Sequence, residues 1–244
     1  MMRAFLGLLL AGLSLSACSV LPSEDPAELE RTWQRAGVVV VRTNTEFKIG
    51  RMEDPEVQSQ LTGLNGGAKR PVIVYLHGCD GLPWEHVPMF FVELAVQGFV
   101  FVAPDSFARS YRPEQCGAQT RWTTAARFAE VRFARDRLRE FDWVDPDRLF
   151  LMGQSEGGYY AGAFQGSGFN GRVVMSAPCF EGRGDPWNTL AVWSKRDTWM
   201  RGFGCAQARY KLALNSDNHS VIFIEEAREA IRSFLLERSG HGPE

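Results

Sequence analysis

This sequence of 244 residues has little net charge, few histidines and no apolar run long enough to cross a bilayer as a helix. Its formal net charge is −2, and its basic and acidic residues are interleaved. No positive field therefore exists to concentrate a polyanion, and we expect no nucleic acid partner. Internal repeats are also missing, and a composition of 45% hydrophobic and 23% charged residues argues against a disordered chain. One globular domain with a buried core is the expectation.

The most apolar segment lies at the amino terminus. Phe5–Leu15 follows Arg3 and has roughly half of the ~20 residues that a membrane-spanning helix needs. It ends in Leu15-Ser16-Ala17-Cys18, a sequence that resembles a bacterial lipobox. We interpret residues 1–17 as a lipoprotein signal peptide and Cys18 as the lipidated amino terminus. An ordinary secretory signal with a chance cysteine is the alternative.

The resemblance to lipoproteins implies a diacylglyceryl group on the Cys18 thiol, which would hold the protein to a membrane without a spanning helix. Ser19 rather than an aspartate follows this cysteine. By the same resemblance, this points to the envelope of a bacterial cell, with a lipid anchor in the outer membrane and the protein facing the periplasm. Residues 18–35 are polar, acidic and contain proline, so we expect a lipidated tether there. The folded domain is expected over residues 36–240.

Short apolar runs alternate with helical periodicity from Pro71 onward, and this order indicates a mostly parallel central sheet with helices on both faces. The expected strands are Val72–Leu76, Phe99–Ala103, Leu149–Met152, Val173–Met175, Leu190–Trp193 and Tyr210–Leu214. The expected helices are about Glu85–Gln97, Thr120–Glu140 and Val221–Leu236. Before them, Gly37–Arg42 and Phe47–Gly50 are expected to pair as a hairpin. The fold class is therefore α/β, and ligands of such sheets bind in the loops that follow the strands.

A G-x-S-x-G sequence stands directly after the expected strand Leu149–Met152. It reads Gly153-Gln154-Ser155-Glu156-Gly157, and a further glycine follows. At a strand-to-helix junction, the glycines of such a motif permit a tight turn that lifts the serine Oγ above the sheet. We therefore predict that Ser155 is a nucleophile. A glycine-rich turn that only packs a helix on a strand is the alternative.

A serine hydroxyl is a poor nucleophile at neutral pH and needs a base, which in turn needs an orienting carboxylate. When the serine lies in such a strand-to-helix turn, the acid and then the histidine follow it along the chain. The sequence has 4 histidines. His77 and His86 precede Ser155, and His241 lies in a polar tail. His219, in the loop between the last expected strand and the last helix, is therefore the predicted base.

The predicted acid is Asp197. It comes just after the expected strand Leu190–Trp193, so its loop should face the loop of His219. Asp185 and Asp217 are the competitors. The first precedes a proline in an expected turn, and the second is close to the histidine in sequence. In the alternative interpretation, Asp197 is a solvated partner of the neighbouring arginine.

Acyl transfer also needs hydrogen-bond donors for the oxyanion, and a preorganised pair of main-chain N–H groups often lowers the barrier by several kcal/mol. The N–H of Glu156, directly after Ser155, is one predicted donor. The other is the N–H of Cys79, in the loop His77–Gly81 after the first of the expected parallel strands. His77 itself is expected to hydrogen-bond nearby main chain rather than to react.

Four motifs occur in the order and spacing of a known family. They are His77-Gly78-Cys79-Asp80-Gly81, Ala103-Pro104-Asp105-Ser106-Phe107, Val144-Asp145-Pro146-Asp147-Arg148 and Gly153-Gln154-Ser155-Glu156-Gly157-Gly158. Over roughly Pro71–Leu236, the chain therefore resembles the dienelactone hydrolase branch of the α/β-hydrolases, and this implies the α/β-hydrolase fold and ester hydrolysis. Dienelactone hydrolase proper uses a cysteine nucleophile where this chain has Ser155. We therefore do not expect this chain to share the substrate of dienelactone hydrolase.

Together these features predict a serine hydrolase that cleaves a small carboxylic ester or lactone through an acyl-enzyme. Ser155, His219 and Asp197 would form the triad, and no cofactor or metal is needed. A peptidase or amidase on the same fold is one alternative, because the triad can cleave either bond. A surface lipoprotein that uses the fold only as a binding module is the other. The expected partners are a small-molecule ester and, through the anchor, a membrane.

Beyond Cys18, every cysteine lies in a loop after an expected strand. An exported domain can oxidise them, and four cysteines permit three pairings. Because loops after neighbouring strands would be joined, we favour Cys79 with Cys116 and Cys179 with Cys205. The first bridge would fix the loop His77–Gly81, the oxyanion loop, which carries the predicted donor Cys79. Free buried thiols are the alternative, and no pair shows the close ligand spacing of a metal site.

Two groups of loop residues are candidates for the substrate surface. Aromatic candidates for the acyl pocket, each of which has packing against the sheet as its alternative, are Phe107, Tyr111, Phe180, Trp187, Trp199 and Phe203. Candidates for binding a substrate carboxylate, most of which we expect at the solvated surface, are Arg109, Arg112, Arg183 and Arg201. The segment Ala177–Asn188 is too short for a large helical lid, so an open site is expected.

Overall fold

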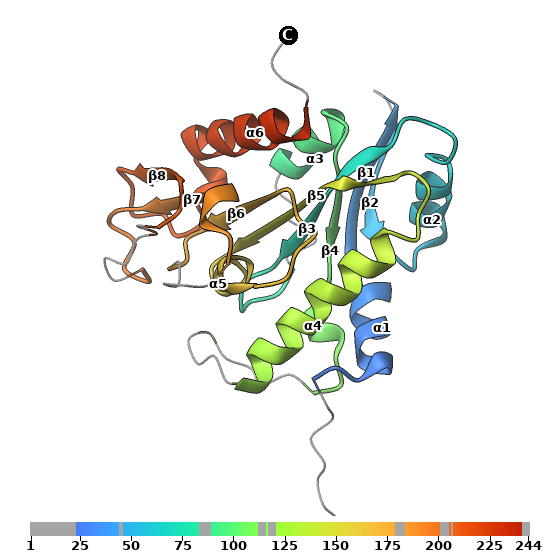
Figure 1. Ribbon diagram of the computed structural model, residues 1–244, viewed down its shortest axis with the longest axis horizontal. Helices are drawn as coiled ribbons and strands as arrows, with labels where there is room; N and C mark the ends of the chain where they lie inside the picture. The colour runs from blue at the N-terminus through green and yellow to red at the C-terminus, as the bar shows by residue number, and fades with distance from the viewer. Residues whose placement is uncertain are drawn as a thin grey trace, which may run out of the picture.

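The computed structural model describes residues 23–43, 46–82, 89–111, 116, 121–178, 184–200, 205 and 207–240. Its centre is an eight-stranded sheet with the order β2-β1-β4-β3-β5-β6-β7-β8 (Figure 1). The strands are β1 (Gly37–Thr43), β2 (Glu46–Arg51), β3 (Arg70–Leu76), β4 (Val100–Ala103), β5 (Val144–Gln154), β6 (Gly171–Met175), β7 (Thr189–Ser194) and β8 (Tyr210–Leu214). β1 pairs antiparallel with β2 and β4, and the other neighbours are parallel. The predicted hairpin and parallel sheet are confirmed.

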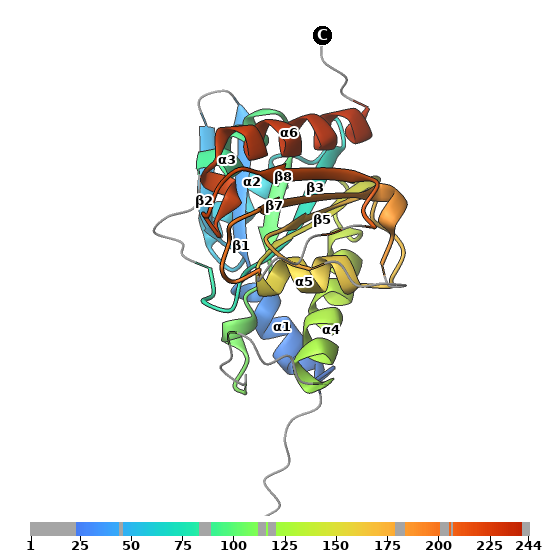
Figure 2. The same cartoon turned by 90° about the vertical axis from the view of Figure 1, so that its left-hand side faces the viewer.

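Helices cover both faces of this sheet (Figure 1, Figure 2). The helices are α1 (Pro26–Gln34), α2 (Pro55–Thr62), α3 (Met89–Val96), α4 (Arg121–Leu138), α5 (Glu156–Ala163) and α6 (Glu225–Ser239), with short 3-10 helices η2 (Ser106–Ala108), η3 (Pro186–Asn188) and η4 (Val221–Phe223). α3 and α6 pack on one face, and the other α-helices pack on the opposite face. The predicted α/β fold class is therefore confirmed. The start of the expected helix Glu85–Gln97 lies outside the described residues.

Strand β3 illustrates why the apolar runs are continuous. Ile73 and Tyr75 belong to the hydrophobic cluster under α3 and α6, whereas Val72, Val74 and Leu76 belong to the cluster on the opposite face. Successive side chains of a strand alternate between faces, so a strand buried on both faces needs an apolar residue at every position. The strands β3, β5, β6, β7 and β8 run parallel to one another. The loops that follow them carry the predicted site residues, and these loops therefore lie at the same edge of the sheet.

The segment that was expected to be a tether contains helix α1. Asp25 caps this helix by accepting hydrogen bonds from the N–H groups of Ala27 and Glu28 at 2.9 and 3.1 Å. Leu29 and Trp33, four residues apart, lie on one face of the helix and are 8% and 3% exposed. The folded part of the chain therefore starts earlier than expected, because the apolar face of this acidic segment is buried against the domain.

Candidate active site

Ser155 occupies the turn between β5 and α5. Its backbone has φ 56° and ψ −122°, and it is one of two non-glycine residues with positive φ among those described. Such a conformation costs about 1–3 kcal/mol and persists only where the surroundings fix it. The Ser155 N–H donates to the Met175 carbonyl at 2.9 Å, and the Ser155 carbonyl accepts the Tyr159 N–H at 2.9 Å as α5 begins. The serine is thereby held at the carboxyl edge of the sheet.

Two glycines of the motif let α5 approach the sheet. A side chain at Gly157 would collide with the Leu76 carbonyl at the end of β3, and one at Gly153 would collide with the main chain of Gly157. Only glycine leaves room for this contact, so the motif packs the turn around Ser155 directly against β3.

Asp197 and His219 meet in the loops after β7 and β8. The His219 Nδ1 lies 2.6 Å from the Asp197 Oδ2. Asp197 is 3% exposed, and its Oδ1 accepts the Trp199 N–H at 2.8 Å. A carboxylate that accepts the Nδ1 proton leaves Nε2 as the basic nitrogen of the ring. The structure thus brings the predicted acid and the predicted base together.

The competing carboxylates lie elsewhere. Asp185 accepts hydrogen bonds from the main-chain N–H of Asn188 at 3.3 Å and from its side-chain amide at 2.8 Å, and so caps η3. Asp217 is exposed. Arg196, the alternative partner of Asp197, donates instead to a side-chain oxygen in the loop after β8 at 2.6 Å. Of the three candidate acids, Asp197 is the one beside the predicted base.

The His219 loop is attached to the residues around the serine through hydrogen bonds from two side chains to one main-chain carbonyl. The His219 carbonyl accepts hydrogen bonds from the Gln154 side chain at 3.2 Å and from the Ser176 hydroxyl at 2.5 Å. Gln154 directly precedes Ser155. Within the described part of the chain, no hydrogen bond joins the Ser155 hydroxyl to the His219 ring. Catalytic hydrogen bonds of this kind often tighten only when substrate binds.

The loop after β3 lies against Ser155. A Cβ added to Gly78 would be 3.6 Å from the Ser155 Cβ, and the Gly81 N–H donates to the Gly78 carbonyl at 3.3 Å to close the loop. The Cys79 N–H donates to no group among the described residues, so it is available to an oxyanion. The other predicted donor belongs to Glu156 at the start of α5, where main-chain N–H groups point out of a helix.

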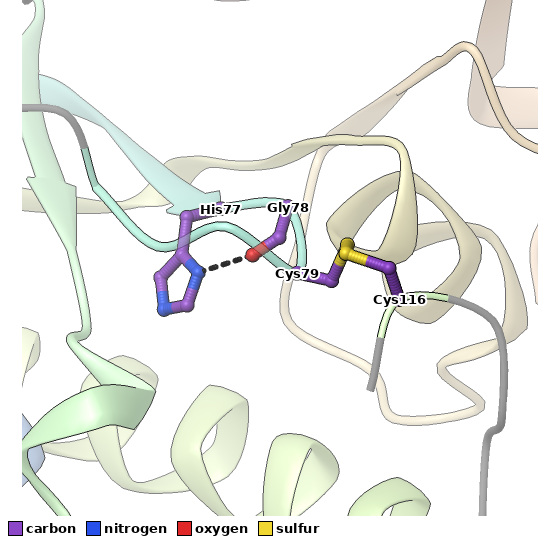
Figure 3. The surroundings of a disulfide bond; sticks show 4 residues. All are labelled: His77, Gly78, Cys79 and Cys116. Atoms are coloured by element: carbon purple, nitrogen blue, oxygen red, sulfur yellow. Dashed lines mark hydrogen bonds between the residues drawn. A yellow bond between two sulfur atoms is a disulfide. The ribbon is translucent and has the colours of Figure 1, made fainter. Parts of the chain in front are cut away.

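A disulfide joins Cys79 to Cys116 and crosslinks the oxyanion loop to the segment after η2 (Figure 3). The two Cα atoms are 5.1 Å apart. This is the first of the two bridges that the loop order favours. Cys205 is buried and also disulfide-bonded. Its expected partner, Cys179, lies outside the described residues, so the second pairing stays a prediction.

His77 is buried and bonds to main chain, as predicted. Its Nδ1 lies 2.7 Å from the Gly78 carbonyl oxygen (Figure 3), and its Nε2 accepts the Ser106 N–H at 3.1 Å. Because Nε2 accepts this hydrogen bond, Nδ1 carries the proton and donates to the Gly78 carbonyl. The ring therefore fixes the oxyanion loop against the turn after β4.

A buried group of charges beside His77 was not predicted from the sequence. Arg109, a candidate for binding a substrate carboxylate, is 6% exposed, and its Nε donates to the Glu130 Oε1 at 2.6 Å. Its assignment to the substrate surface is wrong, because its guanidinium lies inside the protein on a carboxylate of α4. Arg127 is buried next to Glu130. The sequence signal that could have revealed this group is the spacing of three residues between Arg127 and Glu130, which places both side chains on one face of α4.

Two of the aromatic candidates lie beside the predicted catalytic residues. The Trp199 ring centre is 6.0 Å from that of His219, and this tryptophan is 70% exposed. Phe107 lies beside the oxyanion loop and is partly exposed. Tyr111 and Trp187 are exposed as well. The other candidates lie outside the described residues: Phe180, Phe203, Arg112, Arg183 and Arg201.

Among the residues that the structure describes, no three histidine, cysteine, aspartate or glutamate side chains are grouped so that they could hold a metal ion. Within the same residues, no helix has the length and apolarity needed to cross a membrane. Cys18 and the expected signal peptide lie outside the described part. Lipidation stays a prediction, which mass spectrometry of the amino-terminal peptide would test.

Solved structures resemble this chain in fold. A candidate dienelactone hydrolase of Klebsiella pneumoniae aligns at 12% identity with a TM-score of 0.50, over 84% of this chain and 98% of that chain. A puromycin-hydrolysing peptidase of Mycobacterium tuberculosis aligns at 12% identity with a TM-score of 0.51, over 72% of this chain but 35% of that chain. No family model matches the sequence, and no curated protein matches it. The chain has the α/β-hydrolase fold.

Proposed function

We propose that this protein is a serine hydrolase that cleaves a small carboxylic ester or lactone through an acyl-enzyme. The observation that carries the proposal is the hydrogen-bonded pair of Asp197 and His219, 2.6 Å apart, on a loop bonded to the residue before Ser155. Acyl transfer needs an imidazole that is oriented by a carboxylate and lies close to the serine hydroxyl. The α/β-hydrolase fold supports the proposal, since it presents such residues at the carboxyl edge of its sheet.

In the proposed reaction, the His219 Nε2 takes the proton of the Ser155 hydroxyl while Oγ attacks the carbonyl carbon of the ester. The main-chain N–H groups of Cys79 and Glu156 bind the oxyanion. His219 then gives its proton to the departing alcohol, and the acyl group stays on Ser155. A water molecule that is deprotonated by His219 releases the acid, and Asp197 stabilises the charged ring in both steps.

The exposure of the site favours a small substrate. The His219 side chain is 26% exposed. Between β6 and β7, the helical element among the described residues is the short 3-10 helix η3. In the described part of that segment, no helix is long enough to cover the serine. The exposed Trp199 ring offers an apolar wall next to His219 for one side of a small ester.

The first test is labelling with a fluorophosphonate, which reacts with activated serines, followed by peptide mass mapping. We expect modification confined to Ser155, and none in Ser155→Ala or His219→Ala, while both variants keep their fold by circular dichroism. Ser220→Ala, in the same loop as His219, is the control and should label like the wild type. A folded wild-type protein that does not label, or a labelled Ser155→Ala, would contradict the proposal.

Amide cleavage is the second candidate, because one structural neighbour is described as a puromycin-hydrolysing peptidase. The same acyl-enzyme would form from an amide, with His219 protonating the departing amine. The test compares kcat/KM for p-nitrophenyl acetate with kcat/KM for p-nitroacetanilide. We expect turnover of the ester and not of the anilide. Turnover of both at similar rates would favour the amidase.

A further inference from the structure

Arg127 lies buried between the two elements that carry the predicted oxyanion donors. Its side chain is 1% exposed. Its Nη2 donates to the His77 carbonyl at 2.9 Å, at the start of the oxyanion loop, and its guanidinium carbon lies 5.6 Å from the centre of the Tyr160 ring on α5. Cys79 follows His77 by two residues, and Glu156 lies about one helical turn before Tyr160. One side chain therefore contacts both donor elements.

The other side of the guanidinium takes part in a group of buried hydrogen bonds. Its Nη1 donates to the Ser106 hydroxyl and lies 3.3 Å from the Glu130 Oε2. The Ser106 hydroxyl donates in turn to the same carboxylate oxygen at 2.5 Å, and the Arg109 Nε donates to the Glu130 Oε1 at 2.6 Å. Because each partner is itself bonded, Arg127 cannot turn without breaking several buried hydrogen bonds. The planar guanidinium suits such a site, since its donors form a rigid fork.

A second buried arginine provides the matched case. Arg172 of β6 is 5% exposed, donates to the main-chain carbonyls of Ala161, Phe164 and Gly166, and lies 5.8 Å from the centre of the Phe164 ring. Both arginines are buried, donate to main-chain carbonyls and lie near an aromatic ring, and Arg127 in addition pairs with the Glu130 carboxylate. They also differ in position, because the carbonyls bound by Arg172 lie at the far end of α5 from the serine.

We propose that Arg127 is a positioning residue of the oxyanion hole, which fixes the His77 carbonyl, and with it the Cys79 N–H, relative to the Glu156 N–H. The inference rests on the proposed function, because an oxyanion hole matters only if Ser155 performs acyl transfer. The Cys79–Cys116 disulfide holds the oxyanion loop through a side chain, whereas Arg127 holds it through the main chain. Donors act on the transition state only when their geometry is preorganised, and a displacement of ~1 Å can cost about 10²-fold in rate.

The test compares Arg127→Met with Arg172→Met. The readouts are the melting temperature, kcat and KM for p-nitrophenyl acetate, and the rate of fluorophosphonate labelling at a temperature where both variants are folded. We expect both to have a lower melting temperature than the wild type, because each change removes the donor of buried acceptors: the His77 carbonyl and the Glu130 carboxylate for Arg127, and main-chain carbonyls for Arg172. Only Arg127→Met should lose kcat, by about 10- to 100-fold. KM should stay close to that of the wild type, because the oxyanion contacts form in the transition state.

Arg127→Lys provides a second route if the methionine variant does not fold. Lysine keeps the positive charge but cannot bond the His77 carbonyl and the Ser106 hydroxyl in one fixed fork, so its kcat should also fall. A wild-type kcat in either folded Arg127 variant, or equal losses of kcat in Arg127→Met and Arg172→Met, would overturn the proposal. A wild-type protein that is folded but does not label at Ser155 would overturn the proposed function as well, so the two failures are distinguishable.

Discussion

The two halves of the proposed site are held in different ways. On one side, the His219 ring is oriented by a single carboxylate. Its loop is held by hydrogen bonds to the His219 carbonyl from Gln154 and Ser176, and to the next carbonyl along, that of Asn218, from a serine of β7. On the other side, the oxyanion loop is fixed by a disulfide at Cys79 and by a buried arginine under the His77 carbonyl. A ring that takes and returns a proton has to adjust during turnover, whereas main-chain donors act best when immobile. A buried arginine is thus the support that the oxyanion side has and that the described contacts of the His219 loop do not include.

The supports of the oxyanion side extend outward to α1. The Thr32 carbonyl of α1 accepts the Asp105 N–H at 3.1 Å. Glu28 of the same helix accepts the Ser110 N–H at 2.7 Å and the Ser110 hydroxyl at 2.5 Å. These bonds hold the turn after β4, which in turn bonds to His77. The His219 loop has outer contacts of its own, because the Ser194 hydroxyl donates to the Asn218 carbonyl at 2.6 Å and the Arg196 N–H donates to the Ser216 carbonyl at 3.0 Å.

The largest effect should come from the single carboxylate of the histidine side. We expect Asp197→Asn to lower kcat for p-nitrophenyl acetate by about 10⁴-fold, as the corresponding change does in serine proteases, because an amide no longer selects the tautomer with a free Nε2. The melting temperature should change little, since the amide keeps the size of the side chain.

Asp185→Asn is the matched control, because this aspartate caps η3 and does not contact the base. It should leave kcat unchanged. If Asp197→Asn kept kcat within about tenfold of the wild type, the ring would not depend on one carboxylate for its tautomer, and the contrast between the two sides would be lost.

The disulfide should have the next largest effect. Exchanging both Cys79 and Cys116 for serine avoids a free thiol and opens a crosslink across 37 residues. We expect the free energy of unfolding to fall by about 2–4 kcal/mol. kcat should fall as well, but by less than the ~10²-fold that follows loss of an oxyanion donor, since Arg127 still holds the loop. A lower melting temperature with unchanged kcat would show that the crosslink stabilises the fold without positioning the donor.

The sheet and the contact between acid and base could be predicted because both follow from short-range rules. Strands buried on both faces leave continuous apolar runs in the sequence. Asp197 and His219 each come just after a strand, and β7 and β8 are parallel neighbours, so their loops meet at one edge. No knowledge of side-chain packing is needed for either step.

The supports of the oxyanion loop could not be predicted, because they depend on long-range packing of charged residues. Arg109 lies in a polar loop by sequence, and its burial follows from Glu130, a partner 21 residues away on α4. Helix α1 was not predicted, because its segment is acidic, although Leu29 and Trp33 supply its buried face. Composition measures average polarity, whereas burial depends on which face of an element meets the core.

The smallest expected effect tests the outermost support. Glu28→Gln should lower the free energy of unfolding by about 1–2 kcal/mol at neutral pH, because the amide keeps an acceptor for Ser110 but loses the charge that strengthens its hydrogen bonds. kcat should stay near that of the wild type, because α1 contacts the turn after β4 and not the donors. The measurements are urea unfolding and turnover of p-nitrophenyl acetate.

The effect of Glu28→Gln should depend on pH. Burial raises the pKa of the Glu28 carboxyl, but the hydrogen bonds from Ser110 and the charge of Arg31 outweigh burial and hold this pKa below its usual value of 4.5. A pKa that is lower in the folded state stabilises the fold above pH 4.5, and this stabilisation is lost as the pH falls further through the folded-state value. The difference in melting temperature between wild type and Glu28→Gln should therefore be constant near neutral pH and shrink below pH 4.5.

Glu24→Gln, whose exposed carboxylate pairs with Arg132, should show almost no difference at any pH. Equal, pH-independent shifts in both variants would mean that the charge of Glu28 does not help to attach α1 to the domain.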